Sequence, residues 1–433
     1  MPARLDAAAP DFAKRLTALL DRRRADEADA ERAAAEIIAR VRAEGDAAVI
    51  DLTRRFDRVE LSPGTLRIGS AEIAAASAAC DRHQRAALTL AHERIEAYHR
   101  RQLPEDADWR DGAGVRLGWR WRPIDAVGLY VPGGTAAYPS SVLMNAVPAK
   151  VAGVKRLVMA VPTPDGVLNP LVLAAAELAG VDEVYRIGGA QAIAALAYGT
   201  RMIRPVEKIV GPGNAYVAAA KRQLFGQVGI DVIAGPSEIL VVAERGCDPD
   251  WIAADLLSQA EHDVQAQAIL VTDSAELADR VAAAIHRLLA QLPRAEIARA
   301  SWERVGAIVL VPSLEAAAPV VDAVAPEHLE LALVDPEPLL ARIRHAGAIF
   351  LGRFAPEALG DYVAGPSHVL PTGGGARFAS GLGVLDFLKR SSIIGLDRAA
   401  LERIGPAAFR LAEAEGLSAH ALSVALRLDR GER

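Results

Sequence analysis

The sequence is poor in cysteine, because Cys80 and Cys247 are the only two in 433 residues. Two thiols are too few for the disulfide framework of a small secreted domain. The N-terminus also lacks the apolar segment of a secretory signal, since it carries Asp6, Asp11 and Lys14. We therefore expect the protein to work in a reducing cytoplasm.

Two further absences exclude classes of partner. The chain has no long basic run, and its 49 basic residues are outnumbered by 55 acidic ones, so nucleic acid is not an expected partner. The longest uncharged run, residues 126–149, contains three prolines and several glycines and serines. A lipid-exposed helix would not carry them at that density, so we expect no membrane partner.

Strand and helix patterns alternate along most of the chain after Arg122. Short apolar runs end in Gly/Pro turns, and Ala-rich helical patterns follow them, which predicts parallel sheets with crossover helices. We expect an α/β fold of two Rossmann-like parallel-sheet domains with helical extensions at both termini. After Arg377 no strand is indicated. The predicted strands are Ala126–Val131, Leu157–Val161, Glu183–Ile187, Lys208–Val210, Glu238–Ala243, Ala268–Thr272, Ala307–Val311 and Ala348–Leu351.

The chain is divided accordingly into an N-terminal helical extension, two domains and a C-terminal tail. Residues 1–30 form the extension. Residues 31–125 and 238–380 form a first domain that carries the metal and acid/base candidates. Residues 126–237 form a second domain on the dinucleotide side, and residues 381–433 form a helical tail that is expected to exchange between the subunits of a dimer.

No turn matches the dinucleotide fingerprint G-x-G-x-x-G, since Gly211-Pro-Gly is followed by Asn-Ala-Tyr. The glycine-rich turns after Val131, Ile187 and Val210 nevertheless follow the carboxyl ends of strands, where open parallel sheets bind ligands. Backbone N–H groups in such turns suit a phosphate. Glycines that merely permit tight turns are the competing interpretation for each.

Two pairs of polar residues have spacings that suit chemistry. Gln259 and His262 share one helix face and could bind one metal ion, although the pair taken alone fits a solvated helix end better. Glu327 and His328 follow a proline and place two acid/base groups side by side. A helix start with a glutamate in its first turn is the alternative for the second pair.

Further ligand-type side chains occur in irregular or broken segments. Ser237 lies in a turn before a strand, Asp361 and His368 lie in an irregular loop, and Glu415 and His420 flank a glycine break in the terminal helices. Together with the helical Gln/His pair they supply enough nitrogen and oxygen ligands for a zinc-type site with acid/base groups beside it.

These residues, in this order, closely resemble those of the histidinol dehydrogenase family, and the likeness extends over nearly the whole chain. The motifs that carry it are Tyr130-Val-Pro-Gly-Gly, Gly188-Gly-Ala-Gln, Gly211-Pro-Gly-Asn, Ala234-Gly-Pro-Ser-Glu, Ser258-Gln-Ala-Glu-His, Ala325-Pro-Glu-His-Leu, Gly360-Asp-Tyr, Ser367-His-Val-Leu-Pro-Thr and Glu415-Gly-Leu-Ser-Ala-His.

The resemblance implies roles for the matching positions. Zinc, one ion per subunit, would be bound by Gln259, His262, Asp361 and His420, and the acid/base pair would be Glu327 and His328. The family's other substrate contacts correspond to Ser237, His368 and Glu415, in addition to His328 and the zinc ligands. The dinucleotide would contact Tyr130, Gln191 and Asn214. Family members are homodimers whose C-terminal segment reaches into the neighbour, so Glu415 and His420 are expected to complete the partner's site.

The implied reaction is the NAD+-linked oxidation of L-histidinol to L-histidine through L-histidinal, which uses two NAD+ in sequence. His328 would take the alcohol proton, and Glu327 would activate water for attack on the aldehyde. Covalent catalysis by cysteine is disfavoured, because Cys247 lies in an exposed-looking turn with acidic neighbours and Cys80 lies in an Ala-rich helix.

Two other functions are compatible with the same fold. One is a paralogue that oxidises another polar alcohol, but the retained Ser237 and Glu415-Gly-Leu-Ser-Ala-His argue against it, because substrate contacts should change with the substrate. The other is a metal- or nucleotide-binding protein without catalysis, which would have no need of the adjacent Glu327 and His328.

Overall fold

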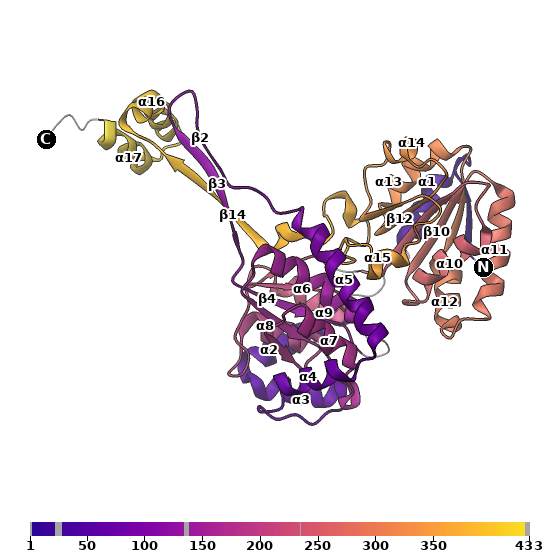
Figure 1. Cartoon of the computed structure of the whole chain (residues 1–433). Helices are drawn as coiled ribbons and strands as arrows, with labels where there is room; N and C mark the ends of the chain where they lie inside the picture. Colours follow the sequence, from indigo (N-terminus) through magenta and orange to yellow (C-terminus); the bar gives the residue numbers. More distant parts are fainter. Residues whose placement is uncertain (1, 22–27, 134–137, 234, 429–433) are drawn as a thin grey trace.

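A computed structural model describes residues 2–21, 28–133, 138–233 and 235–428. These residues form two parallel-sheet units and a projecting arm (Figure 1). We name the two units by their sheets, the six-stranded unit and the five-stranded unit.

The six-stranded unit has the strand order β1-β11-β10-β9-β12-β13, and every strand pair in it is parallel. All residues of the three central strands β10, β9 and β12 are buried, because helices cover both faces of the sheet. Its elements are β1 (Ala3–Asp6), α1 (Phe12–Asp21), β9 (Glu238–Ala243), α10 (Pro249–Ala260), β10 (Gln267–Thr272), α11 (Ala275–Leu289), α12 (Ala295–Val305), β11 (Ala307–Leu310), η2 (Leu314–Ala316), α13 (Ala317–Val324), β12 (His328–Ala332), α14 (Glu337–Leu340), β13 (Ala348–Leu351) and α15 (Ala358–Tyr362).

The five-stranded unit has the strand order β6-β5-β4-β7-β8, again entirely parallel. One face of its sheet packs on α5, α6 and α7, and the other packs on α2, α3, α8 and α9. Its elements are α2 (Ala28–Glu44), α3 (Asp46–Asp57), α4 (Ser70–Ala79), α5 (Arg82–Arg100), β4 (Ala126–Tyr130), α6 (Pro139–Ala152), β5 (Arg156–Ala160), η1 (Pro164–Gly166), α7 (Pro170–Leu178), β6 (Glu183–Tyr185), α8 (Gly189–Tyr198), β7 (Lys208–Val210), α9 (Ala215–Leu224) and β8 (Gly229–Ile230).

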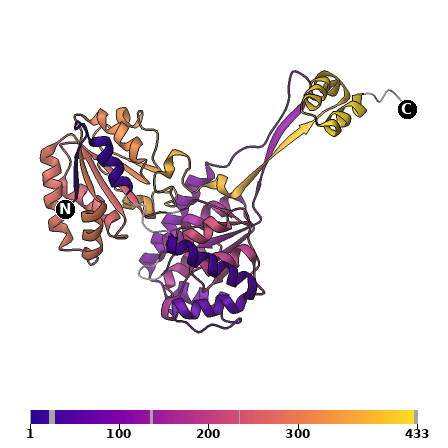
Figure 2. The ribbon, with the colours of Figure 1, turned by 180° about the vertical axis from the view of Figure 1, so that it is seen from behind.

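The arm is an antiparallel ribbon with a helical pair at its tip. It consists of β2 (Ala107–Arg110), β3 (Arg116–Pro123), β14 (Leu388–Gly395), α16 (Arg398–Ala414) and α17 (Ser418–Leu428). Figures 1 and 2 show the ribbon extending away from both units, with α16 and α17 at its far end. Two short 3-10 helices, η3 (Gly375–Arg377) and η4 (Val384–Phe387), lie in the segment that leads from α15 to the arm.

The predicted α/β class with two parallel sheets is confirmed. All eight predicted strands are present, and their ends differ from the prediction by no more than two residues. No helix in the described part of the chain combines the length and the apolar character needed to cross a membrane.

The predicted division of the chain differs from the structure in three places. Residues 1–30 are not purely helical, because β1 adds an edge strand to the six-stranded sheet. Residues 31–125 do not accompany 238–380: the helices α2 to α5 pack on the five-stranded sheet, and β3 enters the arm. Residues 381–433 include the strand β14, so the tail is not only helical. An amphipathic pattern shows that a helix face is covered, but not which sheet covers it.

Candidate active site

A cavity of about 510 Å³ lies between the two units and gathers most of the predicted site residues. The predicted residues that line it are Tyr130, Asn214, Ser237, Gln259, His262, Glu327, His328, Asp361 and His368. Two of the remaining predictions, Glu415 and His420, are exposed on the helical tip of the arm, well away from this cavity (Figures 1 and 2).

The two sheets face the cavity with opposite ends of their strands. In the five-stranded unit the carboxyl ends contribute, since Tyr130 is the last residue of β4 and Asn214 lies just beyond β7. In the six-stranded unit the amino ends contribute, since Ser237 precedes β9 and His328 is the first residue of β12. The rule that ligands bind at carboxyl ends therefore describes only half of this site.

The local backbone before β12 explains why the acid/base pair stands at a strand start. Helix α13 ends at Val324, its C-cap Ala325 has a left-handed conformation with φ of 48°, and Pro326 then directs the chain into the sheet. The carbonyl of Glu327 already accepts a hydrogen bond of 2.9 Å from the N–H of Ala348. The alternative of a helix start at Glu327 is therefore wrong, because the residues after it form a buried strand.

His328 is held in one orientation by the backbone of Glu238. Its Nδ1 lies 3.0 Å from the carbonyl oxygen of Glu238, and because a carbonyl only accepts, Nδ1 carries the proton. Burial lowers the pKa of His328 to about 4, so the ring is neutral and its Nε2 has a free lone pair for a proton. This Nε2 lies 3.6 Å from the carboxylate of Glu357.

Glu327 is anchored to the same neighbour. Its carboxylate accepts a hydrogen bond of 2.9 Å from the backbone N–H of Glu238. Burial raises the pKa of Glu327 well above its ordinary value, and the carboxylates of Glu238 and Asp361 add to the rise. A carboxylate in these surroundings is a stronger base than an exposed one, which suits proton abstraction from water.

Candidate metal ligands converge on the cavity from α10 and α15. Gln259 is 1% exposed, and its Oε1 has no hydrogen-bond partner within the described residues, as expected for an atom that awaits a ligand. His262 lies in the turn after α10, and Asp361 belongs to α15. An amide oxygen, an imidazole and a carboxylate form a donor set that fits zinc.

Glu357 is absent from the predicted site residues, yet the structure places it in the site. Ligand atoms of His328, Glu357 and Asp361 lie within 4.8 Å of one another, a spacing that one metal ion could bridge. The sequence signal is the spacing of four residues between Glu357 and Asp361, which in a helix favours one face, and Glu357 is the N-cap of α15. Glu357 is 2% exposed, and burial raises its pKa, as it does for Glu330 behind it.

The dinucleotide-side residues meet at the glycine-rich turns. The hydroxyl of Tyr130 accepts a hydrogen bond of 3.0 Å from the N–H of Gly189, at the start of α8. Gly211 has φ of 112°, and a Cβ there would lie 2.1 Å from the carbonyl oxygen of Tyr130, so only glycine permits this turn. The side chain of Asn214 caps α9 through the N–H groups of the first helical turn.

Gln191 behaves differently from the other predicted dinucleotide contacts. It lies in α8, is 1% exposed and does not line the cavity, although its Oε1 has no hydrogen-bond partner in the part of the chain that is described. Two further predicted motifs reach positions outside the described residues, at Gly134 and Ala234.

Neither cysteine belongs to the site. Cys247 is buried rather than exposed, its thiol donates to the carbonyl of Ala332, and burial raises the pKa of the thiol. Cys80 is buried as a free thiol in contact with the carbonyl of Ala76. A raised pKa reduces the thiolate fraction, which agrees with the prediction that catalysis is not by cysteine.

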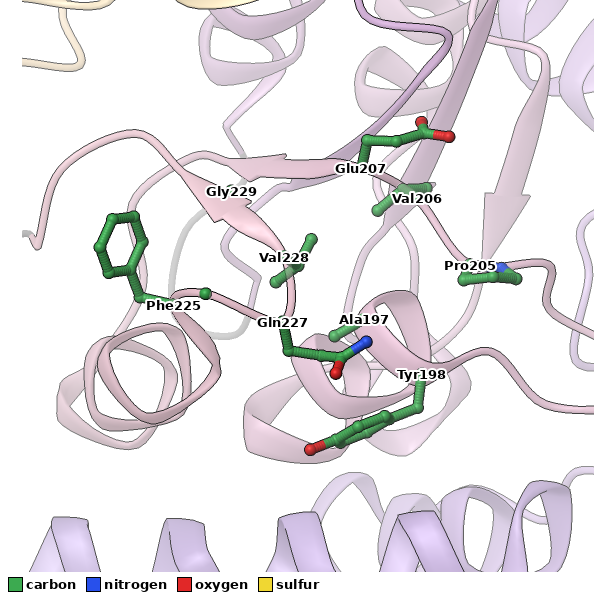
Figure 3. A pocket seen from close by; sticks show the side chains of 10 residues that line it. Ala197, Tyr198, Pro205, Val206, Glu207, Phe225, Gln227, Val228 and Gly229 are labelled. Carbon is green, nitrogen blue, oxygen red and sulfur yellow. The ribbon is translucent and has the colours of Figure 1, made fainter. Parts of the chain in front are cut away.

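A second hollow, at the edge of the five-stranded unit, lacks the groups for this chemistry (Figure 3). It is lined by Tyr198, Glu207, Phe225 and their neighbours, and the carboxylate of Glu207 already accepts from the backbone N–H of Ala126. Its described lining residues include no histidine and only one carboxylate. The cavity between the two units is therefore the candidate active site.

Comparisons with known proteins agree with the geometry. The family model for histidinol dehydrogenase matches residues 20–428. Histidinol dehydrogenases from Cereibacter sphaeroides and Ruegeria pomeroyi are 64% and 62% identical to this chain over 430 residues, which is 99% of this chain and 99% of each relative. The crystal structure of histidinol dehydrogenase from Elizabethkingia anophelis matches with a TM-score of 0.93 and 35% identity, over 99% of this chain and 98% of that one. The chain belongs to the histidinol dehydrogenase family.

Proposed function

We propose that this protein oxidises L-histidinol to L-histidine through L-histidinal, with two NAD+ used in sequence and one zinc ion bound per subunit. One observation carries the proposal: the acid/base pair of the six-stranded unit and the glycine-rich turns of the five-stranded unit open into one cavity. This arrangement lets an alcohol lie between a proton acceptor and a bound dinucleotide, as hydride transfer requires.

The proposed metal site combines residues of both subunits. Gln259, His262 and Asp361 would hold zinc from one chain, and His420 of the partner subunit would complete the site. Bound there, zinc would act as a Lewis acid and as an anchor for the substrate nitrogens. The acidic side chains in the cavity wall, Glu261, Glu327 and Asp361, add negative potential that favours a cationic substrate.

In the first oxidation, Nε2 of His328 would accept the hydroxyl proton of the alcohol. The ring is suited to this step because burial keeps it neutral and the carbonyl of Glu238 fixes its proton on Nδ1. Loss of the proton and of a hydride from the carbinol carbon gives the aldehyde. Ser237, at the start of β9, would contact the same substrate.

In the second oxidation, Glu327 would take a proton from the water that adds to the aldehyde. The resulting hydrate loses a second hydride and leaves the carboxylate product. The raised pKa of the buried Glu327 side chain makes it an effective acceptor for this proton. His328 would thus act as the base in the first oxidation, and Glu327 in the second.

The arm is the basis for proposing a homodimer with shared sites. Its helical tip leaves Leu411, Leu417, Leu422 and Leu426 between 43% and 65% exposed. Exposed apolar side chains on a projecting element suit exchange with a second copy of the chain. Glu415 and His420 would then enter the partner's cavity. We place the enzyme in the cytoplasm, because both cysteines are buried as free thiols.

The test is NADH formation with L-histidinol as substrate, before and after chelation. We expect two equivalents of NADH per alcohol, loss of turnover on chelation and recovery with zinc. Release of one equivalent with accumulation of aldehyde would contradict the four-electron reaction. Oxidation of other polar alcohols at a higher kcat/KM than L-histidinol would favour the paralogue instead.

A further inference from the structure

The imidazole of His368 connects the backbone of one unit with a side chain of the other. Its Nδ1 lies 3.1 Å from the backbone carbonyl of Asp361, and its Nε2 lies 3.2 Å from the hydroxyl of Ser141. The first contact is with the backbone of Asp361, whose side chain is a proposed metal ligand. The second reaches helix α6 of the five-stranded unit. His368 was expected to contact the substrate, but both of its ring nitrogens already have protein partners.

The direction of the first hydrogen bond follows from which of its two atoms can carry the proton. The carbonyl of Asp361 can only accept, so Nδ1 of His368 must donate. The hydroxyl of Ser141 is the hydrogen-bond partner of Nε2 at 3.2 Å, and its removal would leave Nε2 without this bond.

Ser141 lies in a buried and rigid part of the protein, where the loss of its hydrogen bond to His368 would not be compensated by solvent. Ser141 is 2% exposed and lies in the first turn of α6. Together with the residues just before it, Tyr138 to Ser140, it lines the cavity. Helix α6 packs along its length against the core of the five-stranded unit. The hydroxyl therefore belongs to a rigid element rather than to a loop.

The segment that carries Asp361 is tied to both units. On one side, the hydroxyl of Ser258 in α10 lies 3.3 Å from the carboxylate of Glu357, at the start of α15. On the other side, the hydroxyl of Ser367 donates to the carbonyl of Met144 in α6 at 3.4 Å. Asp361 lies between these two attachments, so its position depends on both.

We propose that Ser141 is a positioning residue that fixes the metal ligand Asp361 from the dinucleotide-side helix α6, with His368 as the connecting group. The inference depends on the proposed function, because it takes Asp361 to be a zinc ligand. Ser141 would contact neither the metal nor the reacting atoms. Its effect on zinc is indirect, through the orientation of one ligand.

The experiment measures the zinc dissociation constant of Ser141→Ala by competition with a chelator, together with steady-state kinetics. We expect zinc to bind about tenfold more weakly, within the range known for supporting residues of metal sites. The kcat/KM for L-histidinol should fall by a similar factor at limiting zinc, whereas the KM for NAD+ should stay within about twofold of its original value. Ser141→Cys keeps nearly the same side-chain shape but has a weaker donor. Its zinc dissociation constant should lie between those of the unmodified protein and Ser141→Ala.

Two further variants separate the possible failures. Ser77→Ala removes a hydroxyl on α4 that does not line the cavity and leaves the bond between Ser141 and His368 in place, so its zinc affinity should be unchanged. Asp361→Asn should release zinc. If Asp361→Asn releases zinc but Ser141→Ala does not weaken it, the positioning role is wrong and the metal site stands. If neither variant weakens zinc, Asp361 is not a ligand and both proposals fail.

Discussion

The backbone N–H of Glu238 donates a hydrogen bond of 2.9 Å to the carboxylate of Glu327. The carbonyl of the same residue accepts from His328, so one peptide segment holds both members of the acid/base pair. Glu238 begins β9 and His328 begins β12, and these two strands are paired in the sheet. The pair is therefore mounted on two hydrogen-bonded strands, which restricts the motion of both side chains.

Replacement of His328 by alanine should abolish most of the first oxidation while zinc stays bound. We expect kcat for alcohol oxidation to fall by about 10² to 10⁴, the range for loss of a general base. Zinc content, measured by metal analysis, should match the unmodified protein. The exposed His286 on α11 provides the control, and His286→Ala should change neither quantity. Full turnover by His328→Ala would exclude the assigned role.

Replacement of Glu327 by glutamine should separate the two half-reactions. The amide oxygen can still accept the hydrogen bond from Glu238, so the local structure should persist. Conversion of L-histidinol to the aldehyde should continue, and conversion of L-histidinal to L-histidine should slow by about 10² or more. Each half-reaction is followed separately through NADH. Equal losses in both would show that Glu327 is not specific to the hydration step.

Replacement of His262 by alanine should remove the metal without unfolding α10. His262 lies after the last helical residue, Ala260, whose side chain is fully buried in the core. We expect zinc content well below one ion per subunit, no turnover, and an unchanged circular dichroism spectrum. A variant that kept both its zinc and its activity would contradict the proposed ligand set.

Shared active sites make a sharp prediction for mixed dimers. His328→Ala and His420→Ala should each be inactive alone, but a mixed dimer would contain one site with both histidines if His420 acts in the partner. Random exchange of subunits would then restore about one quarter of the original activity. No recovery after verified exchange would mean that the two histidines do not act across the interface.

Glu183 should contribute to stability in a pH-dependent way. Burial alone would raise the pKa of Glu183, but hydrogen bonds from Arg156, Tyr185 and Arg204 outweigh it and lower the pKa from 4.5 to about 2. Because the folded pKa lies below the unfolded one, the stabilisation is present above the unfolded pKa and is lost as the pH falls toward 2. We expect Glu183→Gln to lower the free energy of unfolding by about 2 kcal/mol at neutral pH.

Urea unfolding at pH 7 and pH 3 checks this prediction. The difference between Glu183→Gln and the unmodified protein should shrink at the lower pH. Glu36 is exposed on α2, and Glu36→Gln should have little effect at either pH. A deficit of the same size at both pH values would show that the charge of Glu183 is not responsible.

The parallel sheets could be predicted because buried parallel strands leave a clear sequence pattern. Strands such as Glu238–Ala243 are apolar runs between a turn and a helix. The edge strand Ala3–Asp6 has only one buried residue, Leu5, and gives no such signal. The arm strand Leu388–Gly395 contains no fully buried residue, so its pairing with β3 is fixed by long-range contact rather than by composition.

The site could be predicted only where the residue types and their order along the chain match the motifs of the family. The structure brings Gln259, His262 and Asp361 to one cavity, although 99 residues separate the last two. Ser141 could not be singled out, because its significance comes from His368, which is distant in sequence. Glu357 is marked in the sequence only by its spacing of four residues from Asp361. Spacing also cannot tell whether Glu415 and His420 act within their own chain, since this is a property of the assembly.

The opposed strand ends at the cavity have a consequence for the geometry of the reaction. The proposed proton acceptor His328 is fixed to one sheet, and the turns proposed to bind the dinucleotide are fixed to the other. The gap that a hydride must cross is therefore set by the tilt between two rigid bodies, not by the rotamer of any single residue. A substitution far from the cavity that changes this tilt by a few degrees would slow hydride transfer and leave the affinity for zinc intact.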